Sequence, residues 1–401
     1  MFSLKFLRLI QILDSNRVPS ISHIQELDYF GTKALEYYTS RIDIVKTPII
    51  YRLLKIYNER TFKDDMHFLD ILQGNNKEKH PLIFNLEYFD STPFETLETF
   101  NIYRGNLKIF EDVAIKISRK NSKNLKKQIH SLEKLTTFSH FLPNGHMSEN
   151  LKDVVKYCKN SMELEYDLNN HHCAMNYLKK MNEAYLPKYP VLKFLKFSKE
   201  FNYLSEKNVY VSKFIDNGRP LNIALAKEKL TMENISNLIY IRLIHLLDIG
   251  IFPKNNSNRD IIVDDDGYFY FRNFYSLCKL HKKNKKILNQ FIKTLLNEDF
   301  SLALNYILLL SINSKQIHED IAFKEEGLKY LEENFSSNKN INIIKIILNL
   351  FKIADAHKFK FSSDIFDFFK ELIFIKLIIL NCRYKIELFT ILKDFINNLN
   401  S

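Results

Sequence analysis

The chain has 401 residues, of which 46% are hydrophobic and 26% are charged. This is ample for a large core, in either one two-lobed unit or two domains. The sequence contains only 8 Gly and 9 Pro, but 33 Phe and 21 Tyr. The low content of Gly and Pro favours long helices over a turn-rich β-sandwich. No segment approaches about 18 uninterrupted apolar residues, so no membrane-spanning helix is expected.

The formal net charge of +11 is compatible with binding to anionic lipid, nucleotide or nucleic acid. The lysines are scattered along the sequence, however, so a compositional bias explains the charge better and nucleic-acid binding is not expected. The cysteines are far apart and form no CxxC pair, which fits a reducing, cytoplasmic compartment. Adjacent helical residues point about 100° apart, so His171-His172-Cys173 is not expected to share one metal ion.

The first half of the sequence changes its hydrophobic period twice. Residues 1–75 repeat apolar residues at a helical period, as in LRLIQIL and IYRLLKIYNE. Residues 82–118 alternate with period two and predict three short strands in PLIFNLEYF, TFNIYRGN and LKIFEDVAIKI. Gly105-Asn106 is the predicted turn between the last two strands. Helices are predicted again over residues 121–140 and 146–183.

The second half begins with three predicted strands, in VLKFLKFS, FNYLSEK and VYVSKFI. A buried helix in ISNLIYIRLIHLLDIG follows, and then a hairpin in IIVDDDGYFYFRNF with Asp266-Gly267 in its turn. Everything after Leu280 is predicted helical. This order predicts a two-lobed α+β protein. We expect three parts: an N-terminal helical extension (1–80), a small-sheet lobe with helices (81–211) and a helical lobe (212–401) with its hairpin at about 261–274.

Two segments in this order of elements indicate a possible catalytic function, and both serve as anchors for the comparison with protein kinases. Val113-Ala114-Ile115-Lys116 lies on a predicted strand that precedes helices, and a Lys in that context reaches the α- and β-phosphates of ATP in protein kinases. The hairpin is the second anchor, because in kinases a hairpin separates the catalytic loop from the Mg²⁺-binding Asp-Phe-Gly. The interpretation requires that Lys116 and the 260–273 hairpin face each other across one crevice.

Over residues 25–395 the sequence resembles the UbiB/AarF/ADCK family of atypical protein-kinase-like proteins. FGTKALEYYTSRIDIV resembles the family's Lys-x-Gly-Gln segment, with Lys33 matching the Lys. MELEYDL resembles the start of the family's acidic helix, where Glu163 and Glu165 match the first two acids. The resemblance implies a two-lobed kinase-like fold, possible cofactors ATP and Mg²⁺, and nucleotide-binding residues Lys116, Lys33, Glu163 and Glu165.

Most of the residues that the family uses for phosphoryl transfer are replaced. PFETLETFNIYR resembles the family's alanine-rich nucleotide loop, but Glu95, Glu98 and Phe100 stand among its small residues, and we expect them to repel or block a phosphate. The Glu that would pair with Lys116 falls at Asn169, so that ion pair is expected to be missing.

The stretch DIGIFPKNNSNRDIIVDDDGYFYFRNF carries the remaining replacements. Asn255 stands at the position of the catalytic base, and it offers no usable proton acceptor. Asp260 replaces the metal-binding Asn, and Asn273 replaces the Asp of Asp-Phe-Gly. The resemblance therefore implies at most a weak metal site, formed by Asp260 and Asn273.

Three hypotheses follow. The first is a pseudokinase that acts as a scaffold or regulator in ubiquinone or isoprenoid-lipid metabolism at a membrane surface, with a lipid, an isoprenoid or a protein as its partner. The second is a residual ATPase or kinase that uses Lys116, Asp260 and a rewired metal site. The third is an unrelated helical interaction protein. Loss of the base and of a metal-binding Asp favours the first. Oligomeric state stays open.

Overall fold

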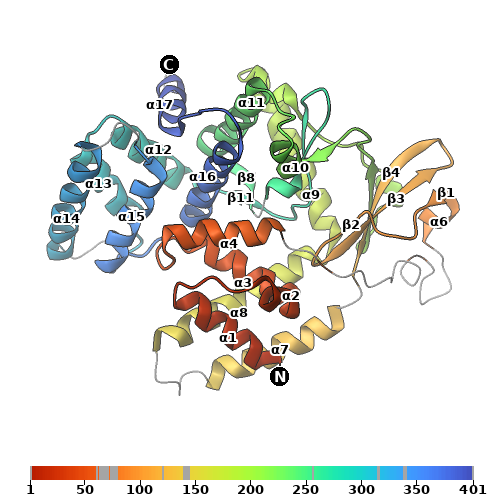
Figure 1. Ribbon diagram of the computed structural model, residues 1–401, viewed down its shortest axis with the longest axis horizontal. Helices are drawn as coiled ribbons and strands as arrows, with labels where there is room; N and C mark the ends of the chain where they lie inside the picture. Colours follow the sequence, from red (N-terminus) through yellow and green to blue (C-terminus); the bar gives the residue numbers. More distant parts are fainter. Residues whose placement is uncertain are drawn as a thin grey trace.

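The computed structural model describes residues 2–59, 62, 72, 80–119, 122–138, 145–254, 257–313, 317–336 and 341–399. N-terminal helices, a small β-sheet lobe and a helical C-terminal region make up the described part of the chain, which confirms the predicted α+β class. In Figure 1 the sheet lies at the right, the N-terminal helices lie below, and the helical C-terminal region fills the left and the top.

Four helices open the chain: α1 (Phe2–Asp14), α2 (Ile21–Leu27), α3 (Tyr29–Ser40) and α4 (Thr47–Glu59). The third is unusual because the consecutive residues from Tyr29 to Thr39 are all buried. It packs against α1, α2, α4, the later helix α8 (Gly145–Glu165) and the tail helix α16 (Ser363–Asn381), so protein surrounds it on all sides. A polar side chain on α3 therefore needs partners inside the protein.

The first sheet has five strands, β1 (Leu86–Phe89), β2 (Glu95–Thr96), β3 (Phe100–Leu107), β4 (Glu111–Ser118) and β6 (Val209–Lys213). They pair in the order β1-β3-β4-β6, with β2 also on β3, and every pair is antiparallel. The alternation along β4 sends Val113, Ile115 and Ile117 into the apolar core of this lobe. Lys116 points to the opposite face, between Ile102 of β3 and Tyr210 of β6.

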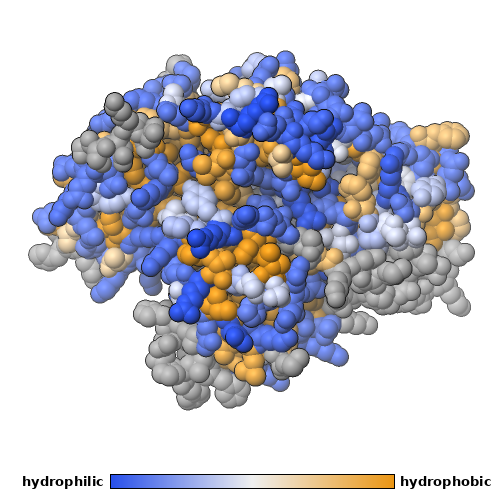
Figure 2. Space-filling view, in the orientation of Figure 1, coloured by the Kyte–Doolittle hydropathy of each residue, from blue (hydrophilic) through white to orange (hydrophobic). Residues whose placement is uncertain are grey.

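The turn between β3 and β4 was predicted at Gly105-Asn106, and that prediction is wrong. The turn lies at residues 108–110. Gly105 lies inside β3 opposite Val113, and a Cβ there would come within 3.0 Å of Ile115 Cδ1. Its small size therefore serves strand packing. Phe110 supplies the positive backbone angle of the turn, with φ 59°. Figure 2 shows hydrophobic atoms at this tip, where Ile109 is 56% and Phe110 84% exposed.

Three of the segments predicted as strands are wholly or partly helical turns. PLIFN forms the short helix α6 (Pro81–Asn85), which Pro at its first position favours. The segments predicted as strands before β6 are mainly the 3₁₀ turns η2 (Pro190–Phe194) and η3 (Asn202–Leu204), with a two-residue strand β5 (Leu195–Lys196). A Pro at the start of the first turn again removes a strand hydrogen bond.

The predicted hairpin is confirmed as β9 (Ile261–Val263) and β10 (Phe269–Phe271), with Gly267 at φ 83° in its turn. Strand β10 also pairs with β5 in parallel, and β9 pairs with β7 (Arg219–Pro220). Strands β8 (Ile251–Pro253) and β11 (Leu277–Lys279) form a separate pair. The turn η5 (Asn258–Asp260) leads directly into the hairpin.

The remaining helices are two that lie in the chain between β4 and β6, and those that follow β6. The buried helix α11 continues into the π-helical turn η4, which ends at Gly250 with φ 73°. Their bounds are α7 (Ser122–Phe138), α9 (Leu168–Tyr185), α10 (Leu221–Ala226), α11 (Met232–Leu243), η4 (Ile244–Ile249), α12 (Lys282–Leu296), α13 (Phe300–Leu310), α14 (Ile317–Ser336), α15 (Ile343–Ala356) and α17 (Leu388–Leu399). Among the described residues, no helix combines the length and apolarity needed to cross a bilayer.

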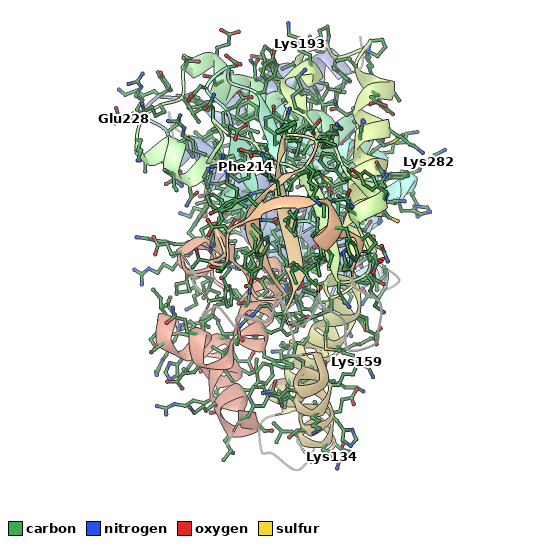
Figure 3. The ribbon with its side chains drawn as sticks, turned by 90° about the vertical axis from the view of Figure 1, so that its right-hand side faces the viewer. Lys134, Lys159, Lys193, Phe214, Glu228 and Lys282 are labelled. Atoms are coloured by element: carbon green, nitrogen blue, oxygen red, sulfur yellow. The ribbon has the colours of Figure 1, made fainter. Side chains whose placement is uncertain are left out.

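Figure 3 looks onto the small-sheet side of the molecule. Of the lysines labelled there, Lys193 lies at the top, Lys282 lies at the right, and Lys159 and Lys134 lie in the lower part.

Candidate functional site

Lys116 of β4 is buried in the interior between the lobes. Its Nζ lies 3.0 Å from Nε2 of His171 on α9. The ammonium also lies over two aromatic rings, 5.1 Å from the centroid of Tyr210 and 5.5 Å from that of Phe100. An active kinase places a helix Glu against this Lys, and here the helix presents an imidazole.

The protonation states of this pair follow from their burial. The pKa of Lys116 falls to about 7, chiefly because burial disfavours the ammonium and then because Arg272 adds positive charge. The pKa of His171 falls well below its usual range, first through burial and then through the charge of Lys116. A hydrogen bond to the backbone of Phe274 holds the imidazole, so Nε2 of the neutral ring accepts from Lys116.

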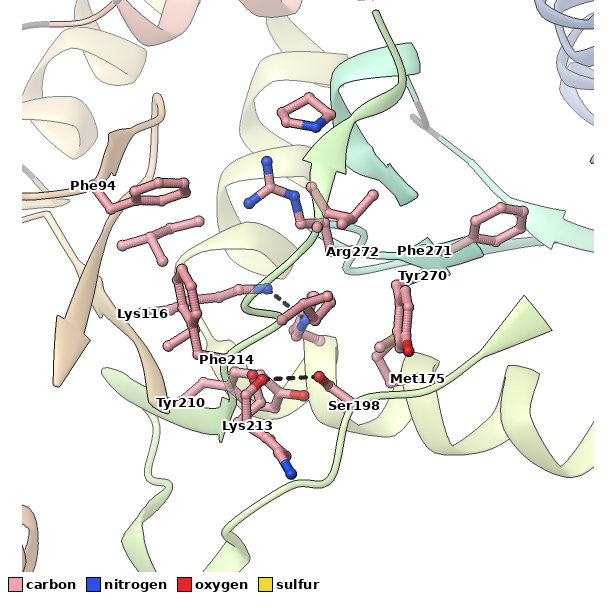
Figure 4. A pocket seen from close by; sticks show the side chains of 18 residues that line it. Phe94, Lys116, Met175, Ser198, Tyr210, Lys213, Phe214, Tyr270, Phe271 and Arg272 are labelled. Carbon is pink, nitrogen blue, oxygen red and sulfur yellow. Dashed lines mark hydrogen bonds between the residues drawn. The ribbon is translucent and has the colours of Figure 1, made fainter. Parts of the chain in front are cut away.

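A cleft of about 700 Å³, counting the space open to solvent, lies between the lobes at Lys116 (Figure 4). Ile102 and Ala114 form its sheet wall, and Ile262, Tyr270 and Phe271 form the opposite wall. Lys116 and the hairpin therefore face one cleft, as the sequence predicts.

The segment that connects the lobes closes the third side of this cleft, with Ser212, Lys213, Phe214, Ile215 and Gly218. A Cβ on Gly218 would come within 2.5 Å of Ile262 Cγ2 and 2.6 Å of Ile215 Cγ2. A glycine is thus required where the connecting segment crosses the hairpin. The lining is largely apolar and aromatic, which suits a flat or hydrophobic group.

The predicted metal residues lie side by side. Asn273 Nδ2 donates to Asp260 Oδ1 at 3.1 Å, and Ser257 Oγ donates to Asp260 Oδ2 at 2.5 Å. Asn273 has φ 62°, a conformation that Asn tolerates better than most residues. Both side chains border a smaller cavity of about 290 Å³. Asn255, at the predicted base position, lies outside the described residues.

Glu95 of β2 reaches across to the helical lobe. Its Oε1 lies 2.7 Å from Nε of Arg259, and its Oε2 lies 2.8 Å from an NH2 nitrogen of Arg272. Burial raises the pKa of this carboxyl, but the charges of Arg272 and Arg259 outweigh burial and lower it. The carboxylate therefore stays ionised between two guanidinium groups.

Lys33 of α3 lies in a second charged cluster, fully buried. Its Nζ lies 2.6 Å from Glu165, 2.9 Å from Glu36 and 3.6 Å from Glu98, and it donates to the Tyr275 hydroxyl at 3.0 Å. One ammonium cannot balance three carboxylates, and burial raises the pKa of Glu165. The predicted residues Lys33 and Glu165 thus meet, and through Glu98 and Tyr275 they adjoin the smaller cavity.

Glu163 is not brought to either cavity. It is exposed near the end of α8, two residues before Glu165, because successive helical residues point about 100° apart. Sequence reasoning also missed His171 and assigned its position to Asn169. The period of Leu168, His171, Met175 and Leu178 places His171 on the buried face of α9, so that signal was present.

The residues present fit only part of Mg²⁺·ATP. The apolar walls suit an adenine ring, with Lys116 and Arg272 pointing into the same part of the cleft (Figure 4). The metal side has one carboxylate, Asp260, beside the neutral Asn273. Within the described residues no group of three or more His, Cys, Asp or Glu side chains could hold an ion. The donor set is therefore too poor in charge for the metal of an active kinase.

A family model described as the ABC1 atypical kinase-like domain matches residues 70–307, more than half of the chain. No curated protein matches the sequence. One similar solved structure is the Rv3197–erythromycin complex from Mycobacterium tuberculosis, with 13% sequence identity and a TM-score of 0.44. That likeness covers 71% of this chain and 70% of the other. On the family match, the chain belongs to the ABC1 atypical kinase-like family, the UbiB type that its motifs resemble.

Proposed function

We propose that the chain is a pseudokinase, whose interlobe cleft binds a ligand without transferring a phosphoryl group. The contact between Lys116 and His171 carries this proposal. A helix Glu would keep the Lys charged for phosphate binding, whereas the neutral imidazole adds no negative charge against burial and Arg272, which lower the pKa of Lys116 to about 7. At neutral pH roughly half of the molecules then lack this positive charge.

The metal side supports the same proposal. Mg²⁺ in kinases is held by the Asp of Asp-Phe-Gly and by the catalytic-loop Asn. Here Asn273 is neutral and donates its amide hydrogen to Asp260. ATP, when bound, would place its adenine against the apolar walls, and no catalytic step follows from these residues.

One observation favours the second candidate, a residual ATPase. Asp260 and Asn273 remain adjacent and both border the smaller cavity beside the cleft. A metal that bound there would require the Asn273 amide to turn its oxygen inward. That oxygen is buried and has no hydrogen-bond partner among the described residues.

An ATP turnover assay decides between the two candidates. We expect the wild-type rate with Mg²⁺ to equal the rates of Lys116→Ala and Asp260→Ala. If the wild type turns over ATP and both substitutions abolish this activity, the protein is a residual ATPase and the pseudokinase proposal is wrong. Thermal shifts with ATP, measured with Mg²⁺ and with EDTA, separately report whether the cleft binds nucleotide.

We propose further that the protein acts as a scaffold or regulator at a membrane, in ubiquinone or isoprenoid-lipid metabolism. The resemblance to the UbiB type supports the metabolic part, and the exposed Ile109 and Phe110 at the β3–β4 tip support the membrane part. Co-sedimentation with vesicles of anionic phospholipid tests the latter. Ser at both positions should reduce binding several-fold, and unchanged binding would exclude the tip as the contact.

A further inference from the structure

A buried ion-pair cluster joins the two lobes beside the cleft. Glu95 belongs to strand β2 of the small sheet, whereas Arg259 lies in η5 and Arg272 follows β10 in the helical lobe. The Glu95 side chain is 8% exposed, and those of Arg259 and Arg272 are 18% and 14% exposed. The carboxylate is thus held between two guanidinium groups in a partly dry environment, where ion pairs are stronger than in water.

The two guanidinium groups supply more positive charge than Glu95 neutralises. Lys116 lies close enough to Arg272 for the guanidinium charge to lower the pKa of Lys116. Asp260 offsets part of it, since it also acts on Lys116, but its carboxylate already accepts from Ser257 and Asn273. Nε of Arg272 is buried and has no hydrogen-bond partner among the residues described. A donor is therefore available for an acceptor that Glu95 does not provide.

The position of the cluster identifies the kind of ligand. Arg272 lines the cleft together with the apolar residues Ile102, Ile262 and Phe271. An anion bound by the arginines would adjoin a hydrophobic chamber. A planar guanidinium pair matches phosphate oxygens in a bidentate manner and needs no metal to do so.

We propose that Arg259 and Arg272 form a binding site for the phosphates of a cleft ligand, that this site needs no divalent cation, and that Glu95 occupies it until displaced. The inference rests on the proposed ligand-binding cleft. The ligand class is a di- or triphosphate attached to an aromatic or apolar group. A nucleotide and a prenyl diphosphate share this chemistry. Glu95 then acts as an internal competitor that sets the ligand affinity.

Isothermal titration in EDTA tests the site with inorganic pyrophosphate, ADP and geranyl diphosphate as separate probes. We expect Glu95→Gln to bind pyrophosphate at least about tenfold more tightly than wild type, because the competing carboxylate is gone. The double variant Glu95→Gln/Arg272→Ala should lose this gain. Glu111→Gln is the matched control, since Glu111 pairs with Lys199 at 2.7 Å elsewhere in the same sheet lobe. It should bind as wild type does.

Three results would overturn the proposal: equal affinity in wild type and Glu95→Gln, a gain that persists without Arg272, or binding that requires Mg²⁺. If Glu95→Gln does not fold, Glu95→Asp replaces it, because the shorter side chain weakens the contact while keeping the charge, and a smaller gain is expected. Tighter binding of ADP or of geranyl diphosphate than of pyrophosphate identifies the ligand source. ATP turnover would show that the pseudokinase proposal is wrong. It would not change the result of the metal-free binding experiment with Glu95→Gln.

Discussion

At the residue scale, Lys116 shows how burial beside a neutral imidazole changes the chemistry of a familiar side chain. Its ammonium donates to a neutral imidazole, and the nearby guanidinium of Arg272 disfavours the charge further. The pKa falls from the ordinary 10.5 to about 7. A charge that a kinase keeps permanently therefore becomes dependent on pH in this chain.

The lowered pKa of Lys116 makes a prediction about stability. Between pH 7 and 9 the unfolded chain keeps the proton on this Lys, because its ordinary pKa is 10.5, whereas the folded protein loses it. The unfolded state then binds more protons, so this residue makes the free energy of unfolding rise with pH, by at most about 1.4 kcal/mol per pH unit. Urea unfolding at pH 7 and 9 should show the rise in wild type and a smaller one in Lys116→Met.

The comparison of the two proteins removes the contribution of all other titrating groups. A difference that is independent of pH would mean that folded Lys116 keeps its proton up to pH 9. The proposal that it is half neutral in the cleft would then be wrong.

Lys33 gives the opposite case, a buried cation with an excess of carboxylates. Burial lowers the pKa of Lys33, but Glu165, Glu36 and Glu98 outweigh burial and raise it. Lys33→Met leaves these carboxylates without the ammonium, and we expect a loss of about 3–5 kcal/mol in the free energy of unfolding. Lys5→Met is the control, because Lys5 pairs with Glu26 at an exposed site, and it should change stability little. Equal effects of both variants would contradict this assignment.

The sequence predicted single residues unevenly, for physical reasons. Lys33, Glu165, Lys116, Asp260 and Asn273 could be singled out in the sequence because each stands in a local motif. The contacts of Glu95 with the two arginines join segments that are 164 and 177 positions apart, and no local pattern reports such a pairing. The sequence predicted Glu95 as a residue that repels or blocks a phosphate, and it could not predict the two arginine partners for that reason.

At the element scale, the β3–β4 hairpin shows when turn residues mislead. Asp266-Gly267 does form a turn, because Gly267 has φ 83° and Asp264 Oδ1 accepts from the Asp266 and Tyr268 amides. Gly105-Asn106 does not, because Gly105 is needed for its size inside the sheet. A glycine that suggests a turn can thus be present for either of two physical reasons, conformational freedom or close packing. The sequence alone does not separate them.

This distinction predicts opposite effects for two substitutions in one hairpin. Gly105→Ala inserts a Cβ 3.0 Å from Ile115 Cδ1 and 3.1 Å from the Tyr88 carbonyl, so it should destabilise the protein by about 1–3 kcal/mol. Phe110→Gly relieves a positive φ at an exposed site, and we expect no loss and a gain of up to about 1 kcal/mol. Chemical denaturation measures both. Gly105→Ala being harmless while Phe110→Gly destabilises would place the turn where the sequence suggested it.

At the scale of the whole molecule, the kinase-like fold excludes the hypothesis of an unrelated helical protein. The order of elements and the period changes sufficed to predict the lobes. The boundaries at residues 80 and 211 stay predictions. One hydrophobic core runs from Phe6 in the N-terminal helices to Ile396 in the last helix, whereas the small sheet has its own cluster around Ile115. Sequence periodicity shows which face of a helix is apolar, and it does not show which other element covers that face.

The shared core predicts that the N-terminal helices and the helical lobe unfold together. Phe30 of α3 and Phe369 of α16 are both buried in it. Truncation of either to Ala removes a large buried side chain and should cost about 3–5 kcal/mol. Scanning calorimetry should therefore show the same main transition shifted to lower temperature in both variants. If Phe30→Ala instead splits off an early transition and leaves the main one in place, the N-terminal helices are a separate unit docked on the lobe. In that case the N-terminal helices could be released, as a means of regulation, while the cleft stays folded. A single cooperative core would not allow this, because the helices and the lobe would unfold together.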